Sequence, residues 1–169
     1  MNISFTGHRP NKLPGGYDAC AYYLAIPIHN VIRDLHNKHG IEKVYCGMAL
    51  GFDQAVAEMC VNMRVKVVAC VPCNNYEVKW PSYSQEKYQQ LLADIESQGG
   101  EIRVLQDKYS PQCLQLRNIY MVDNADIVIA CWDGTTGGTA NCIKYAESKG
   151  KEVINIWDEL QKEAKRHDG

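Results

Sequence analysis

The chain has 169 residues, which is long enough for one domain with a substantial core and too short for two of ordinary size. Apolar residues make up 46% and charged residues 22% of the chain, and the net charge is −2. These values are typical of a globular protein and exclude a bulk attraction to nucleic acid, while no apolar run is long enough to span a bilayer. Because residues 1–5 resemble a strand rather than a signal peptide, we expect a cytoplasmic protein with neither a membrane nor a nucleic-acid partner.

Six short apolar runs predict strands at 3–6, 43–46, 66–71, 102–105, 127–131 and 152–156. The segments that follow them predict helices at 18–39, 53–63, 85–97, 110–123, 138–149 and 158–167. We expect Pro27 to mark a kink or restart, Pro111 to occupy the first position of its helix, and the charged last helix to be exposed. The alternation predicts a single Rossmann-like three-layer α/β domain over 1–169, with a mostly parallel sheet of about six strands.

Eight cysteines are distributed along the chain, mostly within apolar patterns. This placement favours reduced core thiols over disulfides. Cys70 and Cys73 form a CxxC pair, which occurs in redox centres and as half of a zinc site. Since the sequence has no second CxxC and no CxxH, we expect no bound metal and no cofactor.

The strand at 127–131 leads into a turn rich in glycine and threonine, and then into a helix. Such a turn exposes backbone N–H groups at the positive end of the helix dipole, which favours an anion. The alternative is that the glycines only permit a tight turn. The predicted phosphate site consists of Asp133, Gly134, Gly137, Gly138, Thr139 and Asn141.

The first predicted strand ends in Gly7, His8 and Arg9, followed by a proline that keeps Arg9 extended. Ligands of open α/β sheets bind at the carboxyl ends of the strands. Arg9 can hold a phosphate through two hydrogen bonds, and His8 can donate a hydrogen bond or act as a base. A surface loop with two polar residues is the alternative interpretation.

The second predicted strand ends in a turn in which Gly47 and Gly51 permit a close backbone approach. Asp53 falls in the first turn of the next helix, where a carboxylate caps backbone N–H groups. It could instead meet a ribose hydroxyl or act at a glycosidic carbon, which makes it the candidate catalytic residue.

Arg117, on the predicted flank of helix 110–123, could reach the same edge or remain a surface arginine. In that helix we expect Leu116, Ile119 and Tyr120 to face the core. The loop at 74–84 is aromatic and could be a lid or could simply pack down.

Four motifs together resemble the YpsA-like branch of the SLOG superfamily, in particular its prophage-encoded members. They are residues 5–10 (FTGHRP), 47–53 (GMALGFD), 117–123 (RNIYMVD) and 137–139 (GGT). The resemblance covers nearly the whole chain and implies ligand-binding roles for the residues named above and for Asn118. The superfamily includes the DNA-processing protein DprA, sensors of nucleotides related to ADP-ribose, and LOG phosphoribohydrolases, which cleave the N-glycosidic bond of nucleoside monophosphates.

LOG enzymes carry an arginine before the strand that corresponds to 127–131 and a glutamate two residues after their glycine loop. Arg117 fits the first position, but Asn141 stands at the second, and an amide cannot act as a carboxylate base. The resemblance therefore implies binding of a nucleotide or nucleotide-derived small molecule, such as a ribose phosphate or an ADP-ribose relative. An N-glycosidase that uses Asp53 or Glu58 is the alternative, and a DprA-like role on single-stranded DNA ranks third. Relatives often pair through helices, so we also expect a homodimer.

Overall fold

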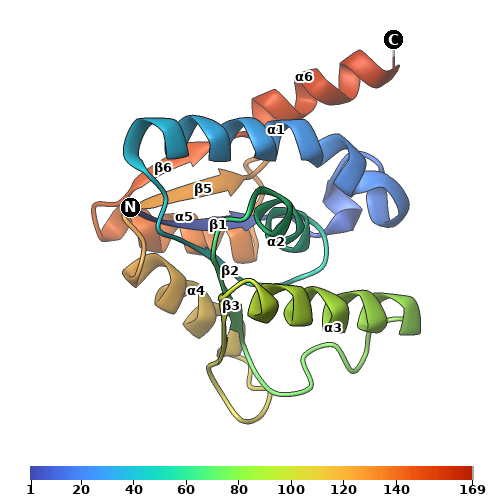
Figure 1. Cartoon of the computed structure of the whole chain (residues 1–169), viewed down its shortest axis with the longest axis vertical. Helices are drawn as coiled ribbons and strands as arrows, with labels where there is room; N and C mark the ends of the chain where they lie inside the picture. Colours follow the sequence, from blue (N-terminus) through green and yellow to red (C-terminus); the bar gives the residue numbers. More distant parts are fainter. Residues whose placement is uncertain (169) are drawn as a thin grey trace.

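The computed structural model describes residues 1–168 and has six parallel strands between two layers of helices (Figure 1). The strand order in the sheet is β4-β3-β2-β1-β5-β6, and every neighbouring pair is parallel. The strands are β1 (Asn2–Gly7), β2 (Lys43–Cys46), β3 (Val67–Val71), β4 (Glu101–Val104), β5 (Ile127–Cys131) and β6 (Glu152–Asn155). The predicted fold class is therefore confirmed.

The helices are α1 (Gly16–His39), α2 (Phe52–Met63), α3 (Ser82–Ser97), α4 (Cys113–Asp123), α5 (Gly138–Ser148) and α6 (Trp157–Asp168), with a short 3-10 helix η1 (Pro10–Lys12). Side chains of a strand point alternately to the two faces of the sheet, so each buried strand contributes to two cores. Val67 and Ala69 of β3 belong to the larger core, which α1, α2, α3 and α6 cover. Val68 and Cys70 face the opposite side, where α4 packs, and α5 covers the neighbouring part of that side.

Three expectations about the helices are wrong. Helix α1 does not restart at Pro27 but continues through it, and Pro27 is buried together with Leu24 and Ile28. Helix α4 begins at Cys113, because the residues before it form a tight turn in which the Cys113 N–H donates to the carbonyl of Ser110. Helix α6 is not wholly exposed, since its Leu160 and Glu163 are buried; it packs against α1.

The inward face of α4 also differs from the prediction. Arg117, Asn118 and Met121 are buried, whereas Leu116 is 43% exposed. Because this part of α4 covers the polar carboxyl ends of the strands, a guanidinium and an amide find hydrogen-bond partners there that a leucine could not use. Apolar spacing therefore placed Leu116 wrongly, whereas Tyr120 packs against a core cluster as predicted.

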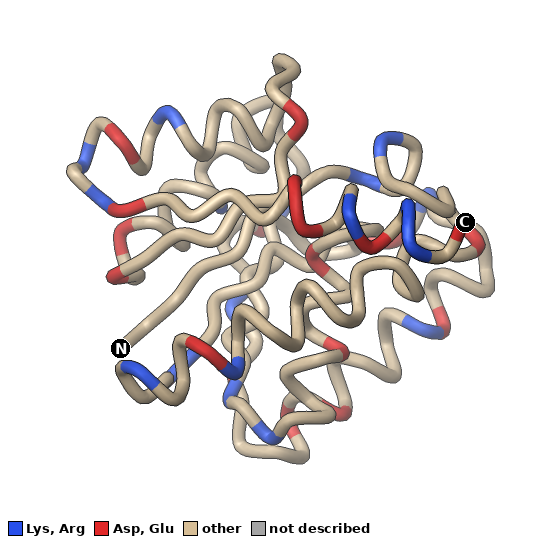
Figure 2. The backbone as a smooth tube through the Cα atoms, turned by 90° about the horizontal axis from the view of Figure 1, so that it is seen from above, with Lys and Arg blue, Asp and Glu red and all other residues tan. Residues whose placement is uncertain are grey.

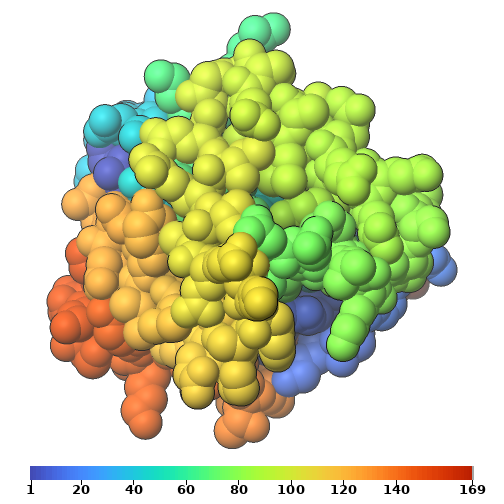
Figure 3. All heavy atoms as spheres, turned by 90° about the horizontal axis from the view of Figure 1, so that it is seen from below, coloured from blue at the N-terminus to red at the C-terminus, as the bar shows by residue number. Residues whose placement is uncertain are grey.

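The loop at 72–81 packs down, which is the second of the two interpretations that the sequence left open. Trp80 packs edge-on against Tyr88 of α3, with ring centroids 5.2 Å apart. Asn74 donates a hydrogen bond to Asp107 at 3.0 Å. Figure 3 shows this loop, in green, between the yellow-green surface of α3 and the yellow segment that precedes α4.

All eight cysteines are buried and none forms a disulfide, as predicted. Within residues 1–168, no helix combines the length and the apolar character needed to cross a membrane.

The strand order creates a switch point between β1 and β5. From β1 the chain proceeds to β2, β3 and β4 on one side, and it later returns to place β5 and β6 on the other. The connections on the two sides diverge, which leaves a crevice at the carboxyl ends of β1 and β5. The candidate site lies in this crevice.

Candidate functional site

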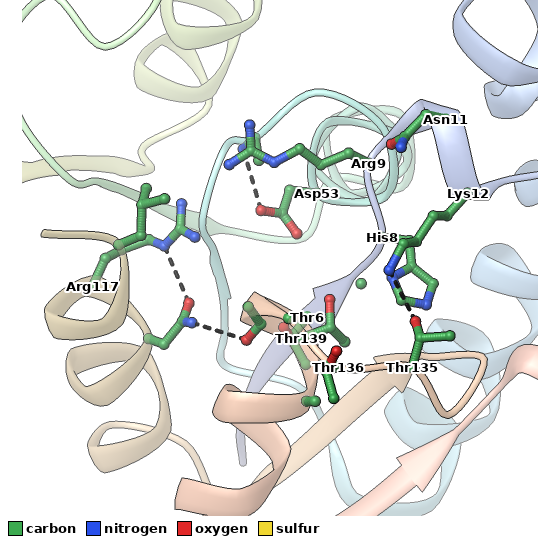
Figure 4. Close-up of a pocket in the computed structure, with 17 residues that line it drawn as sticks. Thr6, His8, Arg9, Asn11, Lys12, Asp53, Arg117, Thr135, Thr136 and Thr139 are labelled. Carbon is green, nitrogen blue, oxygen red and sulfur yellow. Dashed lines mark hydrogen bonds between the residues drawn. The ribbon is translucent and has the colours of Figure 1, made fainter. Parts of the chain in front are cut away.

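A cleft of about 250 Å³ opens at the carboxyl ends of β1 and β5 (Figure 4). Four separate segments line it. They are Thr6–Arg9 with Asn11 and Lys12, Ala49 with Asp53, Leu114 with Arg117 and Asn118, and Thr135–Ala140. Turns far apart in the sequence thus converge on one rim of the sheet.

The start of α5 forms one wall of the cleft. Gly137, its N-cap, has no side chain to cap the helix, and the first turn contains no acidic residue. The first N–H groups of an α-helix have no intrahelical acceptor, so they remain available to a ligand. A Cβ atom added at Gly138 would meet nothing within 4 Å, which shows that the space in front of this turn is open.

Two cations, Arg9 and Lys12, line the cleft on the side away from the start of α5, and neither forms an ion pair with a carboxylate among the described residues. Lys12 donates a hydrogen bond to the hydroxyl of Thr135 at 2.9 Å and so bridges η1 and the β5–α5 turn. Arg9 is exposed and extends toward Asp53 (Figure 4). Neither side chain forms an ion pair within residues 1–168. Asp53 is the one carboxyl of the described residues that lines the cleft, against the three cations Arg9, Lys12 and Arg117, so the cleft carries an excess of positive charge.

Arg117 forms the base of the cleft and is only 6% exposed. Its Nη1 donates to the carbonyl of Gly47 at 2.7 Å, and its Nε donates to Asn118 Oδ1 at 3.3 Å. Burial disfavours the charged guanidinium, but Tyr76 and Asp53 outweigh this effect and raise the pKa of Arg117. Arg117 is thus a fixed buried cation.

Gly47 permits this packing. A Cβ atom at Gly47 would lie 2.9 Å from both Arg117 Cζ and Asp53 Oδ2, so only glycine lets the strand end approach the two charged groups. Gly47 does not line the cleft, but it sets the position of Arg117, which does.

Asp53 lies in the first turn of α2 and is 6% exposed. Its Oδ2 accepts a hydrogen bond from the N–H of Ala49 at 3.2 Å. Burial raises the pKa of Asp53 above 3.8, and Arg117, the Ala49 N–H and Arg9 oppose that rise. A cleft-lining carboxyl with a raised pKa can accept a hydrogen bond from a sugar hydroxyl or exchange a proton.

His8 is buried at the end of β1, and its Nε2 lies 2.8 Å from Asp133 Oδ1 and 3.1 Å from the Asp133 N. Thr135 donates to the same carboxylate oxygen through its hydroxyl at 2.6 Å and its N–H at 3.0 Å. The Thr135 hydroxyl and N–H, followed by His8, lower the pKa of Asp133 to about 2. Asp133 does not line the cleft; it holds His8, which does.

Because its pKa is lower in the folded than in the unfolded chain, ionised Asp133 stabilises the fold above pH 3.8, and this contribution is lost as the pH falls toward about 2. We therefore expect Asp133→Asn to be less stable than the parent protein at pH 6, with a difference that shrinks as the pH approaches 2. Urea unfolding at a series of pH values measures this difference. A difference that stays constant from pH 6 to pH 2 would show that the Asp133 charge does not contribute.

The structure brings most of the predicted site residues together. Gly7, His8, Arg9, Asp53, Arg117, Asn118, Gly137, Gly138 and Thr139 line the cleft, whereas Gly47, Gly51, Asp133, Gly134 and Asn141 do not. Asn141 is exposed because it lies two residues beyond buried Thr139, roughly 200° around the helix axis. Gly51 has φ +95° and packs against the His8 carbonyl behind the cleft.

Sequence reasoning missed several residues of the cleft. They are Thr6, Asn11, Lys12, Ala49, Leu114, Thr135, Thr136 and Ala140. Lys12 carried a usable signal, since it follows Arg9 by three residues and a single 3-10 turn brings the two to one side. Thr135 and Thr136 belong to the glycine-rich turn itself, where hydroxyl groups accompany the backbone N–H groups.

The parallel sheet, its strand order and its switch point define a Rossmann-like α/β protein. The cleft with cations and free N–H groups lies at that switch point. The model of the YpsA family, described as the YspA SLOG family, matches residues 3–157. The chain belongs to this SLOG family, which confirms the predicted resemblance.

The SPbeta prophage-derived protein YoqJ of Bacillus subtilis (strain 168) is 29% identical in an alignment of 133 residues, which covers 69% of this chain and 76% of YoqJ. DprA from Streptococcus pneumoniae superposes with a TM-score of 0.64 at 18% identity over 98% of this chain and 54% of DprA, so the chain spans about half of that protein. DprA from Helicobacter pylori, whose structure describes a single-stranded DNA binding mode, gives a TM-score of 0.64 at 19% identity over 96% and 72% of the two chains. At these identities the two DprA structures share the fold.

Proposed function

We propose that the protein binds a nucleotide or nucleotide-derived ligand, of the ribose phosphate or ADP-ribose type, by its phosphate in this cleft. The observation that carries the proposal is that two cations without an ion pair among the described residues, Arg9 and Lys12, line the same cleft as the uncapped start of α5. Backbone N–H groups and a guanidinium are the groups that hold phosphate oxygens. Asp53, between them and Arg117, is placed to accept from a ribose hydroxyl.

We expect a phosphorylated ligand to raise the melting temperature, and Arg9→Ala to remove most of that rise. A ligand at 100 times its Kd adds about 2.7 kcal/mol, or roughly 5–10 °C for a chain of this size. Loss of a hydrogen bond to a charged group weakens binding by about 10- to 100-fold. Thermal unfolding with AMP, ADP, ADP-ribose, cyclic ADP-ribose and ribose 5-phosphate measures both effects.

Arg33→Ala is the matched control, because Arg33 is exposed and its partner is the adjacent Asp34 on α1, far along the chain from the cleft. It should melt and bind as the parent protein does. The proposal fails if no phosphorylated compound of the panel changes the melting temperature, or if both arginine variants bind equally well.

Asp53 favours one second function, cleavage of an N-glycosidic bond. It is a buried carboxyl of raised pKa in the cleft, whereas Asn141 is outside it and Glu58 is paired with Lys87 at 3.1 Å. Incubation with nucleoside monophosphates and chromatography for free base separates the two functions. Base release that Asp53→Asn abolishes would establish the enzyme, and binding without release would leave a binding protein.

Single-stranded DNA is tested as a competing ligand in the thermal-unfolding assay, because the structure of Helicobacter pylori DprA describes a single-stranded DNA binding mode. The net charge of this chain is −2, and Figure 2 shows acidic and basic residues interspersed along the backbone. The expectation that nucleic acid is not a partner receives no support from the DprA structures and is tested by a salt-dependent gel shift. The homodimer and the cytoplasmic location also stay predictions, the first of which sedimentation velocity can test.

A further inference from the structure

We propose that a second cavity, which we call the base groove, holds the nucleobase of the ligand whose phosphate occupies the cleft. This inference rests on the proposed function and specifies the ligand further. The base groove has a volume of about 540 Å³ and lies between the first turns of α1, α2 and α3. Its lining includes Pro10, Tyr17, Asp18, Gly51, Tyr83 and Lys87.

The cleft and the base groove share a thin wall. His8, Arg9, Asn11 and Lys12 face the cleft, while Pro10, from the same turn, faces the groove. On the α2 side, Ala49 faces the cleft, and Leu50 and Gly51 face the groove. A Cβ atom at Gly51 would lie 2.8 Å from the His8 carbonyl oxygen and 2.9 Å from Pro10 Cδ, so the two strand-end turns touch and only one layer of backbone separates the cavities.

The cleft alone is too small for a complete nucleotide. Its volume of about 250 Å³ is below the roughly 300–1,000 Å³ of sites that enclose whole small molecules. No aromatic side chain lines it other than the imidazole of His8. The cleft therefore supplies polar partners for a phosphate and a sugar but, among the described residues, no aromatic ring of Phe, Tyr or Trp on which a base could stack. Arg9 and Asn11, both exposed, lie on the wall where a ligand would cross.

The groove offers what a base requires. Tyr17 and Tyr83 line it and are 69% and 76% exposed, so their rings are available for stacking. Asp18 also lines it, and its carboxylate has no hydrogen-bond or ion-pair partner among the described residues. A carboxylate accepts hydrogen bonds and has none to donate, so it favours the exocyclic amino group of adenine over uracil, whose one Watson–Crick donor, N3–H, lies between two carbonyl oxygens that a carboxylate repels.

Binding of ADP, UDP and ribose 5-phosphate, measured by calorimetry on the full chain, tests the inference. We expect ADP to bind at least 10-fold more tightly than ribose 5-phosphate and more tightly than UDP. Stacking on one aromatic ring corresponds to about 5- to 150-fold in affinity. Tyr83→Ala should therefore lower the affinity for ADP by about 10-fold and leave the affinity for ribose 5-phosphate unchanged. Asp18→Asn should remove the preference for ADP over UDP.

Tyr109→Ala is the matched control, because Tyr109 is also 69% exposed and lines neither cavity. It should bind all three compounds as the parent protein does. Equal affinity for ADP and ribose 5-phosphate, with no effect of Tyr17→Ala or Tyr83→Ala, would overturn the base groove while the phosphate site stands. Failure of these three compounds and of AMP, ADP-ribose and cyclic ADP-ribose to bind would instead overturn the proposed function and this inference together.

Discussion

Arg117→Ala is expected to lower the free energy of unfolding at pH 7 by about 3–5 kcal/mol. Arg117 is 6% exposed, donates to the Gly47 carbonyl at 2.7 Å and is the charge that most strongly opposes the rise that burial causes in the pKa of Asp53. Its truncation removes the strongest opposing charge of a buried carboxyl and leaves a buried carbonyl without its donor. For a chain of this size the midpoint of thermal unfolding should fall by about 10 °C or more.

The pH dependence of this loss identifies its cause. Burial raises the pKa of Asp53, so the folded chain prefers the protonated carboxyl, and removal of Arg117 strengthens that preference. A carboxyl whose pKa is higher in the folded than in the unfolded chain stabilises the fold at low pH. This stabilisation is lost as the pH rises through the pKa of the folded state. The deficit of Arg117→Ala should therefore be larger at pH 7 than at pH 4.

Arg33→Ala, at an exposed arginine, should leave the midpoint nearly unchanged at both pH values. A deficit in Arg117→Ala that is independent of pH would assign the loss to packing and to the Gly47 hydrogen bond, and would show that Asp53 does not depend on the guanidinium charge.

The fold was predictable because its signals are local. Buried strands such as β3 and β5 are apolar on both faces, and each is followed by a segment of helical spacing. The errors fell where a tertiary contact determines the result. Pro27 remains within α1, where it is buried, and α4 buries Arg117 and Asn118 rather than Leu116 where it covers the strand ends.

The candidate site was predictable to the extent that its residues follow strands directly. His8, Arg9 and Gly138 come immediately after β1 or open the helix after β5, and parallel strands bring their carboxyl ends to one edge. Lys12 and Leu114 lie further along the chain, and only the turn of η1 and the packing of α4 bring them to the cleft. Spacing in the sequence cannot show such contacts.

Gly138→Asp is expected to abolish phosphate binding without loss of stability. The Cβ atom at Gly138 meets nothing within 4 Å, and Gly138 has no positive φ that would strain a side chain. An acidic residue in the first turn of a helix adds about 0.3–1 kcal/mol of stability, so the melting temperature should stay the same or rise slightly. The added carboxylate, however, lies in the cleft between the N–H groups of α5 and the cations Arg9 and Lys12.

Two like charges 4 Å apart repel by about 4 kcal/mol at an effective dielectric constant near 20, so affinity for ribose 5-phosphate or ADP should fall by at least 100-fold. Asn141→Asp is the matched control, since it adds the same charge three residues further along α5 on an exposed side chain outside the cleft. Calorimetry and thermal unfolding of both variants measure affinity and stability separately. If the two variants lose affinity equally, net charge rather than contact at the helix start governs binding; if only Gly138→Asp loses it, the phosphate lies against the first turn of α5.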